Sequence, residues 1–306
     1  MKLAPVVLFT FNRPKHTAET LNALAANQLV AETNLYIFSD GPRNTKDFAK
    51  IKEVRTLLHA MKAQSIFKNV IIFESKENKG LANSVISGVS QVFSEYNSVI
   101  VLEDDLVTSN DYLKFMNICL HKYEGNDKIG CFTGYNPLKK MPTDYNQDVY
   151  FSTRTNSLGW ATWKNIWNNV DWEARAYNRF KKSFKQRKSF NATGYDRAKR
   201  LDLQMQKDAK SWSILFGFDN FINNKYTVYP KDSKLIHIGW DGTGTHYGGD
   251  IDKFNDKYKI SKYPLKLPNE IVLEKGLIKL QRKLFGDGFI IKVKDVLIFI
   301  KNFLIH

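Results

Sequence analysis

The residues of this sequence that most directly suggest chemistry are three adjacent acids, Glu103-Asp104-Asp105, which follow an apolar run ending at Leu102. Adjacent carboxylates repel one another, so they need a cation or several hydrogen-bond donors close by. Hard divalent cations take oxygen ligands and are commonly held by one or two carboxylates together with substrate phosphates. The cluster therefore indicates a Mg²⁺ or Mn²⁺ site that binds a diphosphate. The alternative is a solvated acidic turn that caps a helix starting near Ser109.

The elements that would position this cluster are predicted from an alternation of short apolar runs with helical patterns. Nearly all-apolar strands separated by helices are typical of a parallel sheet covered on both faces. Ligands of such sheets bind beyond the carboxyl ends of the strands, and both Asp40 and the acidic cluster follow such an end. We expect strands at 6–11, 35–39, 70–73 and 98–102 and helices at 14–24, 48–61 and 80–92, the last with Leu81, Val85, Val89 and Val92 on one face.

The second half of the chain is less regular. Residues 136–172 are rich in Asn, Thr, Gly and Trp, which predicts loops that line a site more than regular packing. The glycine-rich residues 241–249 must form a loop. No internal repeat or low-complexity linker marks a domain boundary. Helices are expected at 112–123 and 211–221, and strands at 129–132 and 226–230.

Composition limits the class of protein. A chain of 306 residues with 43% hydrophobic content has a sizeable core, and a net charge of +15 favours an anionic partner. Cys119 and Cys131 form neither a CxxC pair nor a Cys/His zinc spacing, which indicates a reducing compartment. The first residues lack a signal-peptide layout, and no stretch has the length of a transmembrane helix. We expect a cytoplasmic protein, either soluble or peripheral on the inner membrane face.

The end of the chain has a different pattern. From Leu277 onward, Leu, Ile and Phe alternate with Lys and Arg, and residues 291–304 carry an apolar stripe flanked by Lys292, Lys294 and Lys301. A basic amphipathic helix of this kind can lie in a membrane interface. It can equally pack on the body of the protein or on a second subunit, and the pattern leaves both interpretations open.

Four ordered motifs in the first 110 residues resemble those of GT-A glycosyltransferases. The resemblance is closest to the N-acetylglucosaminyltransferase family that begins complex N-glycan synthesis and to bacterial family-2-like sugar transferases. Two later elements, Gly-Trp-Ala-Thr-Trp (159–163) and Gly-Thr-His (244–246), resemble the same bacterial group. The four motifs are Val-Leu-Phe-Thr-Phe-Asn-Arg-Pro (7–14), Phe-Ser-Asp-Gly (38–41), Asn-Lys-Gly-Leu-Ala-Asn-Ser-Val (78–85) and Val-Leu-Glu-Asp-Asp-Leu (101–106).

The resemblance implies an α/β fold of the GT-A type, with a Rossmann-like, mostly parallel sheet flanked by helices. It implies one domain over residues 1–265, divided into a nucleotide-sugar-binding half (1–108) and an acceptor and catalytic half (109–265). Residues 266–306 would form the basic amphipathic helical tail.

The resemblance also implies roles for single residues. The first loop would meet the nucleotide, although Asn12-Arg13-Pro14 also fits a helix N-cap segment. Asp105 would ligate the metal directly, while Asp104 and Glu103 would hold the ribose and the donor sugar. The other implied contacts are Thr10, Asn12 and Arg13 with the nucleotide, Asp40 with the base or ribose, and Gly80, Leu81 and Asn83 beside the donor.

The catalytic base is harder to assign. Inverting relatives use a carboxylate to take the proton of the acceptor hydroxyl. Asp208, four residues before Trp212, fits best, with Asp219 as the rival and other positions open. His246 would complete the metal shell or bind the diphosphate, or it is simply a solvated loop residue. The aromatic residues Trp160, Trp163 and Trp240 are candidates for stacking on a sugar, with core packing as the alternative for each.

We therefore expect a Mn²⁺- or Mg²⁺-dependent, inverting hexosyl- or N-acetylhexosaminyltransferase. Its donor would be a nucleotide sugar, with a UDP-sugar favoured, and its acceptor a glycan or a lipid-linked glycan of surface polysaccharide or glycolipid synthesis. A sugar-nucleotide nucleotidyltransferase is disfavoured because the first strand runs into a loop without glycine. A nucleic-acid-binding protein is also disfavoured, because the basic run 180–200 lacks a recognised nucleic-acid motif.

Overall fold

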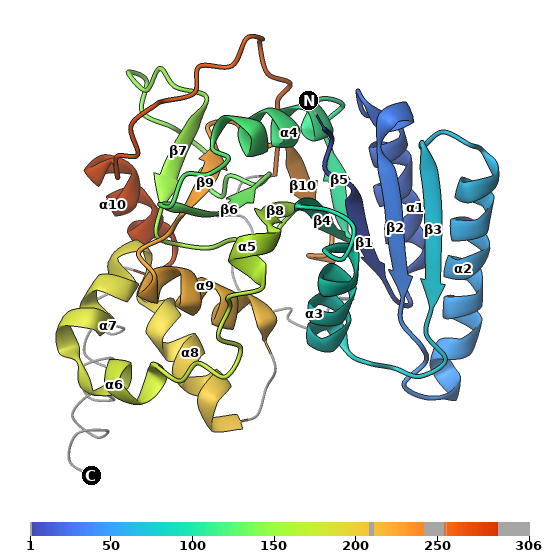
Figure 1. The fold of residues 1–306 in the computed structure, drawn as a ribbon, viewed down its shortest axis with the longest axis horizontal. Coiled ribbons are helices and arrows are strands. Elements are labelled where there is room, and N and C mark those ends of the chain that lie inside the picture. Colours follow the sequence, from blue (N-terminus) through green and yellow to red (C-terminus); the bar gives the residue numbers. More distant parts are fainter. Residues whose placement is uncertain (1, 208–210, 242–253, 255, 287–306) are drawn as a thin grey trace.

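The structure is a computed structural model that describes residues 2–207, 211–241, 254 and 256–286 (Figure 1). It is built around a mixed sheet of eight strands in the order β3-β2-β1-β4-β8-β6-β9-β7, flanked by helices. A second, two-stranded sheet pairs β5 with β10. The strands are β1 (Val6–Thr10), β2 (Asn34–Ser39), β3 (Asn69–Glu74), β4 (Ser98–Glu103), β5 (Leu106–Thr108), β6 (Ile129–Thr133), β7 (Val149–Ser152), β8 (Trp160–Trp163), β9 (Tyr226–Pro230) and β10 (Leu235–His237).

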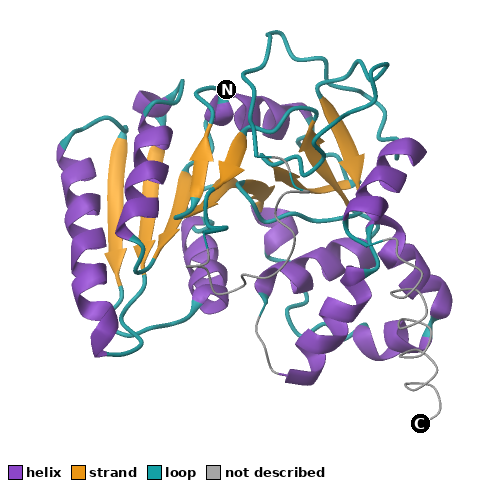
Figure 2. Ribbon diagram, turned by 180° about the vertical axis from the view of Figure 1, so that it is seen from behind, coloured by secondary structure: helices purple, strands orange, loops and turns teal. Residues whose placement is uncertain are grey.

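The helices alternate with the strands in the first half of the chain and gather at one end in the second (Figure 2). Short 3₁₀ turns lie at Val30–Glu32, Thr45–Asp47 and Asn191–Thr193. The α-helices are α1 (Pro14–Ala25), α2 (Phe48–Ala63), α3 (Leu81–Val92), α4 (Tyr112–Lys122), α5 (Lys164–Trp167), α6 (Tyr177–Lys182), α7 (Phe184–Phe190), α8 (Asp196–Lys207), α9 (Trp212–Ile222) and α10 (Lys275–Leu284).

The first half confirms the predicted parallel sheet. Strand β1 pairs in parallel with β2 on one side and with β4 on the other, and β2 pairs in parallel with β3. The chain therefore moves outward from β1 to β3 and then returns past β1 to form β4. Because such crossovers are right-handed, this reversal places α3 on the opposite face of the sheet from α1 and α2. The carboxyl ends of β1 and β4 lie side by side, at the point where ligands of open α/β sheets bind.

The second half departs from the prediction of site-lining loops. Residues 136–172 contain two strands, and β8 lies in the middle of the sheet, antiparallel to both β4 and β6. Four of the seven strand pairings in this sheet are parallel, so the sheet is mainly parallel but mixed. The four-residue strand β8 is too short for a hydrophobic period to reveal it in the sequence.

The core that joins the two halves is aromatic. Trp160 of β8 is 1% exposed, and its ring stacks on Trp167 at 5.4 Å and lies 4.8 Å from Trp212. Phe216 packs against the same ring at 5.7 Å. Strand β8 and helix α9 thus share one buried cluster, which fixes the second half against the sheet of the first.

The two cysteines, Cys119 on α4 and Cys131 on β6, are both buried and unbonded to each other. Burial is the main cause that raises the pKa of each thiol. Both thiols are therefore enclosed in the core.

The start of the expected C-terminal tail packs on the body of the protein. Leu267 and Ile271 contact the main core, and α10 is held by the fully buried Gln281, whose side chain hydrogen-bonds to Ser152 and Tyr150. The apolar stripe predicted at 291–304 lies outside the described residues. Within the described ranges, no helix is both long enough and apolar enough to cross a bilayer.

We predict that Trp160→Ala lowers the free energy of unfolding by about 3–5 kcal/mol, because the change leaves a cavity among three aromatic side chains. Trp160→Phe should cost clearly less, since it retains most of the packing. Urea unfolding followed by circular dichroism measures both, with the exposed Phe48→Ala as a control that should stay within about 0.5 kcal/mol of wild type. A loss below about 1 kcal/mol for Trp160→Ala would contradict this account of the core.

Candidate functional site

The candidate site is built where β1 and β4 end together. Phe9 of β1 lies opposite Glu103 of β4 in the parallel register, so the loop after β1 faces the acidic cluster directly. The backbone N–H of Phe11 donates a hydrogen bond to Asp104 Oδ2 at 3.3 Å. Two segments that are far apart in the sequence are thus brought together by one pair of strands.

Arg13 lies between the two aspartates. Its Nη2 atom contacts Asp104 Oδ1 at 2.5 Å and Asp105 Oδ2 at 2.6 Å, and both aspartates are buried. Burial alone would lower the pKa of Arg13, but the charges of Asp104 and Asp105 outweigh it and raise that pKa. The guanidinium therefore stays charged and balances part of the negative charge of the cluster.

The three acids differ in their environments. Burial raises the pKa of Glu103 to about 8, and the neighbouring charges of Asp105 and Asp104 add to that effect. Burial also raises the pKa of Asp104, although Arg13 opposes it. For Asp105, burial is outweighed by the hydrogen bond and charge of His237 and by Arg13, so its pKa falls to about 2. Asp105 is the acid of the cluster that remains an anion most readily.

His237 is a site residue that the sequence analysis missed. Its Nε2 atom lies 3.2 Å from Asp105 Oδ2, and the backbone N–H of Ile238 donates to the Asp105 carbonyl at 2.9 Å. The residue ends β10, a strand of three residues, and reaches the cluster because β10 pairs with β5. The sequence offers no periodic signal for so short a strand. The predicted metal ligand His246 lies outside the described residues.

Three buried polar atoms around the cluster have no hydrogen-bond partner within the part of the chain that the structure describes: Thr10 Oγ1, Arg13 Nη1 and His237 Nδ1. Buried polar atoms are normally paired, and exceptions need an explanation such as contact with an ion or a ligand. Thr10 ends β1, Arg13 lies in the loop after it, and His237 ends β10. They are candidates for contact with a bound group.

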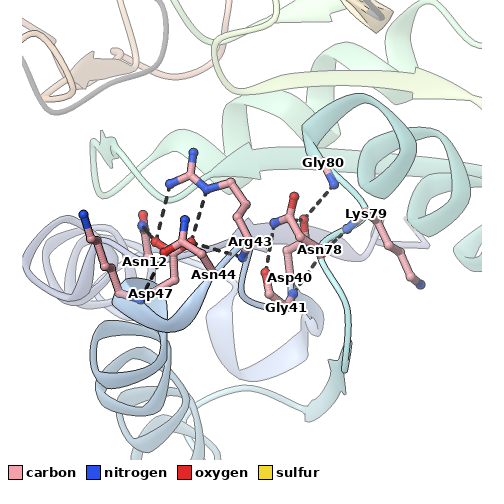
Figure 3. A network of polar contacts seen from close by, with 10 residues as sticks. Asn12, Asp40, Gly41, Arg43, Asn44, Asp47, Asn78, Lys79 and Gly80 are labelled. Atoms are coloured by element: carbon pink, nitrogen blue, oxygen red, sulfur yellow. Dashed lines mark hydrogen bonds and ion pairs between the residues drawn. The ribbon is translucent and has the colours of Figure 1, made fainter.

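The Asp40 carboxylate accepts hydrogen bonds from Gly41 and from the loop 78–80 (Figure 3). Its Oδ1 accepts from the backbone N–H groups of Gly41 and Lys79, and its Oδ2 accepts from Gly80 N–H and Asn78 Nδ2, at 2.8–3.1 Å. The carboxylate thus ties the end of β2 to the turn that opens α3. Within the described structure its role is to hold this loop, and the predicted contact with a base or ribose remains a prediction.

Asn12 is oriented by a second acid, Asp47, which was not identified from the sequence (Figure 3). Asn12 Nδ2 donates to Asp47 Oδ1 at 2.6 Å, and the backbone N–H and Nε of Arg43 donate to Asp47 Oδ2. The Arg43 guanidinium also lies over the Phe11 ring, 4.7 Å from its centroid. Asp47 takes one N–H of the amide and thereby fixes the orientation of the Asn12 side chain.

Gly80, Leu81 and Asn83, which were predicted to lie beside the donor, are at the start of α3. Gly80 has φ +74°, which favours glycine, and it precedes the first residue of the helix. Asn83 Nδ2 donates to the Lys79 carbonyl, so it supports the same turn. Leu81 shares one helical face with Val85 and Val89, as predicted, but it is 44% exposed whereas the two valines are buried. Leu81 is the first residue of the helix.

The tryptophans predicted as sugar-stacking residues fall into two groups. Trp160 and Trp163 are 1% and 8% exposed and are packed in the core, so the core-packing alternative holds and neither presents a free ring face. Trp240 lies near the cluster, edge-on to the His237 ring at 4.7 Å and stacked on Phe254 at 5.7 Å. It therefore packs against a residue that touches Asp105.

The two candidates for the catalytic base have different outcomes. Asp208 lies outside the described residues. Asp219 lies in the last turn of α9, where its carboxylate accepts hydrogen bonds from Asp171 N–H at 3.0 Å and Asn223 Nδ2 at 3.1 Å. Burial raises the pKa of Asp219. Its known contacts are with a neighbouring turn, and none of them joins it to the acidic cluster.

The cluster offers a cation two oxygen ligands but no complete cage. A single nitrogen of Arg13 contacts one oxygen of each aspartate, so one positive centre can reach both. Among the described residues, no group of three or more His, Cys, Asp and Glu side chains is arranged to hold a metal by itself. Mg²⁺ is usually held by one or two carboxylates plus substrate phosphates. The donor set fits a cation that is shared with a phosphate ligand.

Comparison with known proteins gives a likeness of fold. No family model matches the chain. A crystal structure of S. aureus TarS is similar over 77% of this chain and 36% of that one, with a TM-score of 0.44 and 13% identity. A crystal structure of S. aureus TarS 1–349 is similar over 76% of this chain and 59% of that one, with a TM-score of 0.43 and 11% identity. A crystal structure of UDP-glucose pyrophosphorylase complexed with UDP-glucose is similar over 78% of this chain and 94% of that one, with a TM-score of 0.40 and 11% identity. This chain thus spans less than two thirds of each TarS chain.

These scores are too low to support an argument about function. The class of protein follows from the molecule itself: a mixed, mainly parallel α/β sheet flanked by helices, with acids at the ends of adjacent strands. This arrangement is Rossmann-like and is consistent with the GT-A fold that the resemblance implied.

We predict that Asp40→Asn lowers the free energy of unfolding by about 1–3 kcal/mol, because a carboxamide accepts on one side only and leaves buried N–H groups unpaired. Hydrogen exchange of the Lys79 and Gly80 amides should also become faster. The exposed Glu77→Gln in the same loop is the matched control and should change neither quantity. Unchanged exchange at both amides in Asp40→Asn would show that Asp40 does not hold this loop.

Proposed function

We propose that the protein is a glycosyltransferase that uses a nucleotide-sugar donor and a divalent cation. The observation that carries this proposal is the convergence of Asp104 and Asp105 on one positive centre at the carboxyl ends of β1 and β4. Two buried carboxylates at that edge of an α/β sheet, with unpaired buried polar atoms around them, suit a metal–diphosphate complex. The order of the four GT-A-like motifs supports the same function.

In this proposal Asp105 and Asp104 hold Mn²⁺ or Mg²⁺, and His237 lies close enough to Asp105 to orient it or to join the metal shell. The bound cation would stabilise the departing nucleoside diphosphate. Arg13 supplies a second, permanent positive charge beside the phosphates. Asp40 holds the turn that opens α3, so that the first amides of that helix can face a phosphate.

The reaction that we propose inverts the configuration of the sugar. A carboxylate takes the proton of the acceptor hydroxyl as that hydroxyl attacks the anomeric carbon. Asp208 remains the favoured base and Asp219 the rival, although the carboxylate of Asp219 already accepts two hydrogen bonds from Asp171 and Asn223. We propose a UDP-sugar as the donor, with hexose or N-acetylhexosamine as the transferred group.

We also propose a glycan or lipid-linked acceptor, and a place at the cytoplasmic side of the membrane. The net charge of +15 supports an anionic acceptor or surface. The segment 291–304 would then contact the bilayer through its apolar stripe, with the flanking lysines near the headgroups. Vesicle binding of a chain shortened after Gly286 would report on that contact.

A nucleotidyltransferase is the second candidate. It would have to grip a triphosphate with the loop after β1, yet that loop contains no glycine. The two functions differ in their products. Release of pyrophosphate from a nucleoside triphosphate and a sugar phosphate would favour the second candidate over the transferase.

We predict that a UDP-sugar with Mn²⁺ raises the melting temperature of the protein, and that a chelator reverses the shift. A thermal-shift panel of UDP-, GDP-, CMP- and dTDP-sugars makes this measurement and identifies the base. Asp105→Ala should abolish the metal-dependent shift while the protein remains folded, because the most acidic ligand is lost. The exposed Asp127→Ala is the control and should behave as wild type. No response to any sugar nucleotide would argue against the proposed function.

A second prediction concerns Gly239, which packs directly against the carboxylate of Asp105. A Cβ at this position would overlap Asp105 Oδ2 and come within 3.0 Å of His237 Nε2. Gly239→Ala should therefore displace the Asp105 carboxylate and weaken Mn²⁺-dependent nucleotide binding. A loss of about 1.4 kcal/mol in binding free energy corresponds to roughly tenfold lower affinity. Isothermal titration measures the change. Gly276→Ala, where a Cβ meets nothing within 4 Å, is the control. Equal affinities for the two variants would remove Asp105 and His237 from the binding site.

A further inference from the structure

Helices α6, α7 and α8 form a basic surface that the proposed site does not use. Residues 177–206, which we call the basic lobe, contain nine Lys or Arg residues and two Asp residues. The lobe has its own small core, in which Phe180 and Phe190 pack against Phe218 of α9. It is therefore a built part of the fold, and its surface charge has a fixed position.

Both acids of the lobe are already paired. Asp202 forms a buried, two-pronged ion pair with Arg187 at 2.8–2.9 Å. Asp196 forms a similar pair with Arg154, which comes from outside the lobe. The outer face of the lobe consequently carries positive charge with little compensation. Its exposed cations are Arg179, Lys182, Lys185, Lys188, Lys199 and Arg200.

Two large apolar side chains are exposed among these cations. Phe184, the first residue of α7, is 53% exposed, and Lys188 lies one helical turn after it on the same exposed face. Leu203 of α8 is 41% exposed, with Lys199 one turn before it. Residues four apart share one side of a helix. Each helix thus presents an apolar side chain next to a lysine.

The lobe lies at the end of the molecule that also holds the candidate site. In Figure 1, the arrowheads of β2 and β3 point toward the end where α6, α7 and α8 lie, and the reverse view in Figure 2 agrees. The carboxyl ends of the parallel strands, and with them Asp104 and Asp105, are at that same end. A surface bound by the lobe would therefore be on the site's side of the protein.

We propose that the basic lobe docks on a bilayer surface that contains anionic lipids. Clustered Lys and Arg residues are attracted to anionic headgroups, and a neighbouring Phe or Leu side chain can enter the headgroup boundary. Nucleic acid would also attract the cations, but an aliphatic side chain such as Leu203 offers no ring on which a base can stack. The inference deepens the proposed function, because it places a lipid-linked acceptor near the site, but membrane docking does not require that function.

The test is co-sedimentation of the full chain with vesicles. Wild type should pellet with vesicles of phosphatidylcholine and phosphatidylglycerol at 0.1 M NaCl, and it should remain in solution with phosphatidylcholine alone or at about 0.5 M NaCl, where surface charge is screened. Each lysine near an anionic surface contributes roughly fivefold to partitioning. Lys185→Glu/Lys188→Glu should therefore lower partitioning at least roughly tenfold, and Phe184→Ser should lower it severalfold.

The matched control is Lys50→Glu/Lys52→Glu on the exposed side of α2, which makes the same change in net charge far from the lobe in sequence. Circular dichroism confirms that each variant is folded. The proposal is overturned if wild type ignores anionic vesicles, if the α2 variant loses as much binding as the lobe variant, or if the lobe variant binds like wild type. It is also overturned if single-stranded RNA at equal salt binds the lobe more tightly than the vesicles do. None of these measurements uses a nucleotide sugar, so the proposed function and the docking surface can fail separately.

Discussion

Asp104 and Asp105 lie so close together, and so far from solvent, that their charge must be balanced from within the protein, and Arg13 provides that balance from the loop after β1. A buried carboxylate without a partner would be neutralised or would destabilise the fold. The ion pairs therefore constrain much of what surrounds them. They hold the loop after β1 against the end of β4, and they leave Asp105 facing His237 at the end of the small second sheet.

The same kind of charged contact holds the other segments of the site in place. Asp47 holds Asn12, Asp40 holds the turn before α3, and Arg13 holds the acidic cluster. Each of these groups uses its charge to fix a neighbouring segment of backbone or side chain. The atoms left over, such as Thr10 Oγ1 and His237 Nδ1, are those that can contact a ligand. In physical terms the site is organised in advance, which reduces the cost of ordering it when a ligand binds.

The sequence predicted the first half of the fold well, because β1 to β4 are apolar runs separated by helical patterns and turn residues. It identified the acidic cluster for the same reason, since acids directly after an apolar strand stand out. It did not predict β8 or the role of His237, because those depend on short strands whose partners lie elsewhere in the chain. Asp47 was missed because its function is set by contacts with Asn12 and Arg43, and a local pattern does not record such contacts.

The buried state of the cysteines has a practical consequence for spectroscopy. Cys119 and Cys131 are the only cysteines of the chain, both are 0% exposed, and burial keeps their thiols protonated. Because the thiolate is the reactive form, a maleimide dye or a nitroxide reagent would leave both unmodified in the native protein. A single thiol introduced at an exposed position would then be the one labelled atom. The wild-type chain thus already serves as the unreactive background for distance measurements by fluorescence or electron resonance.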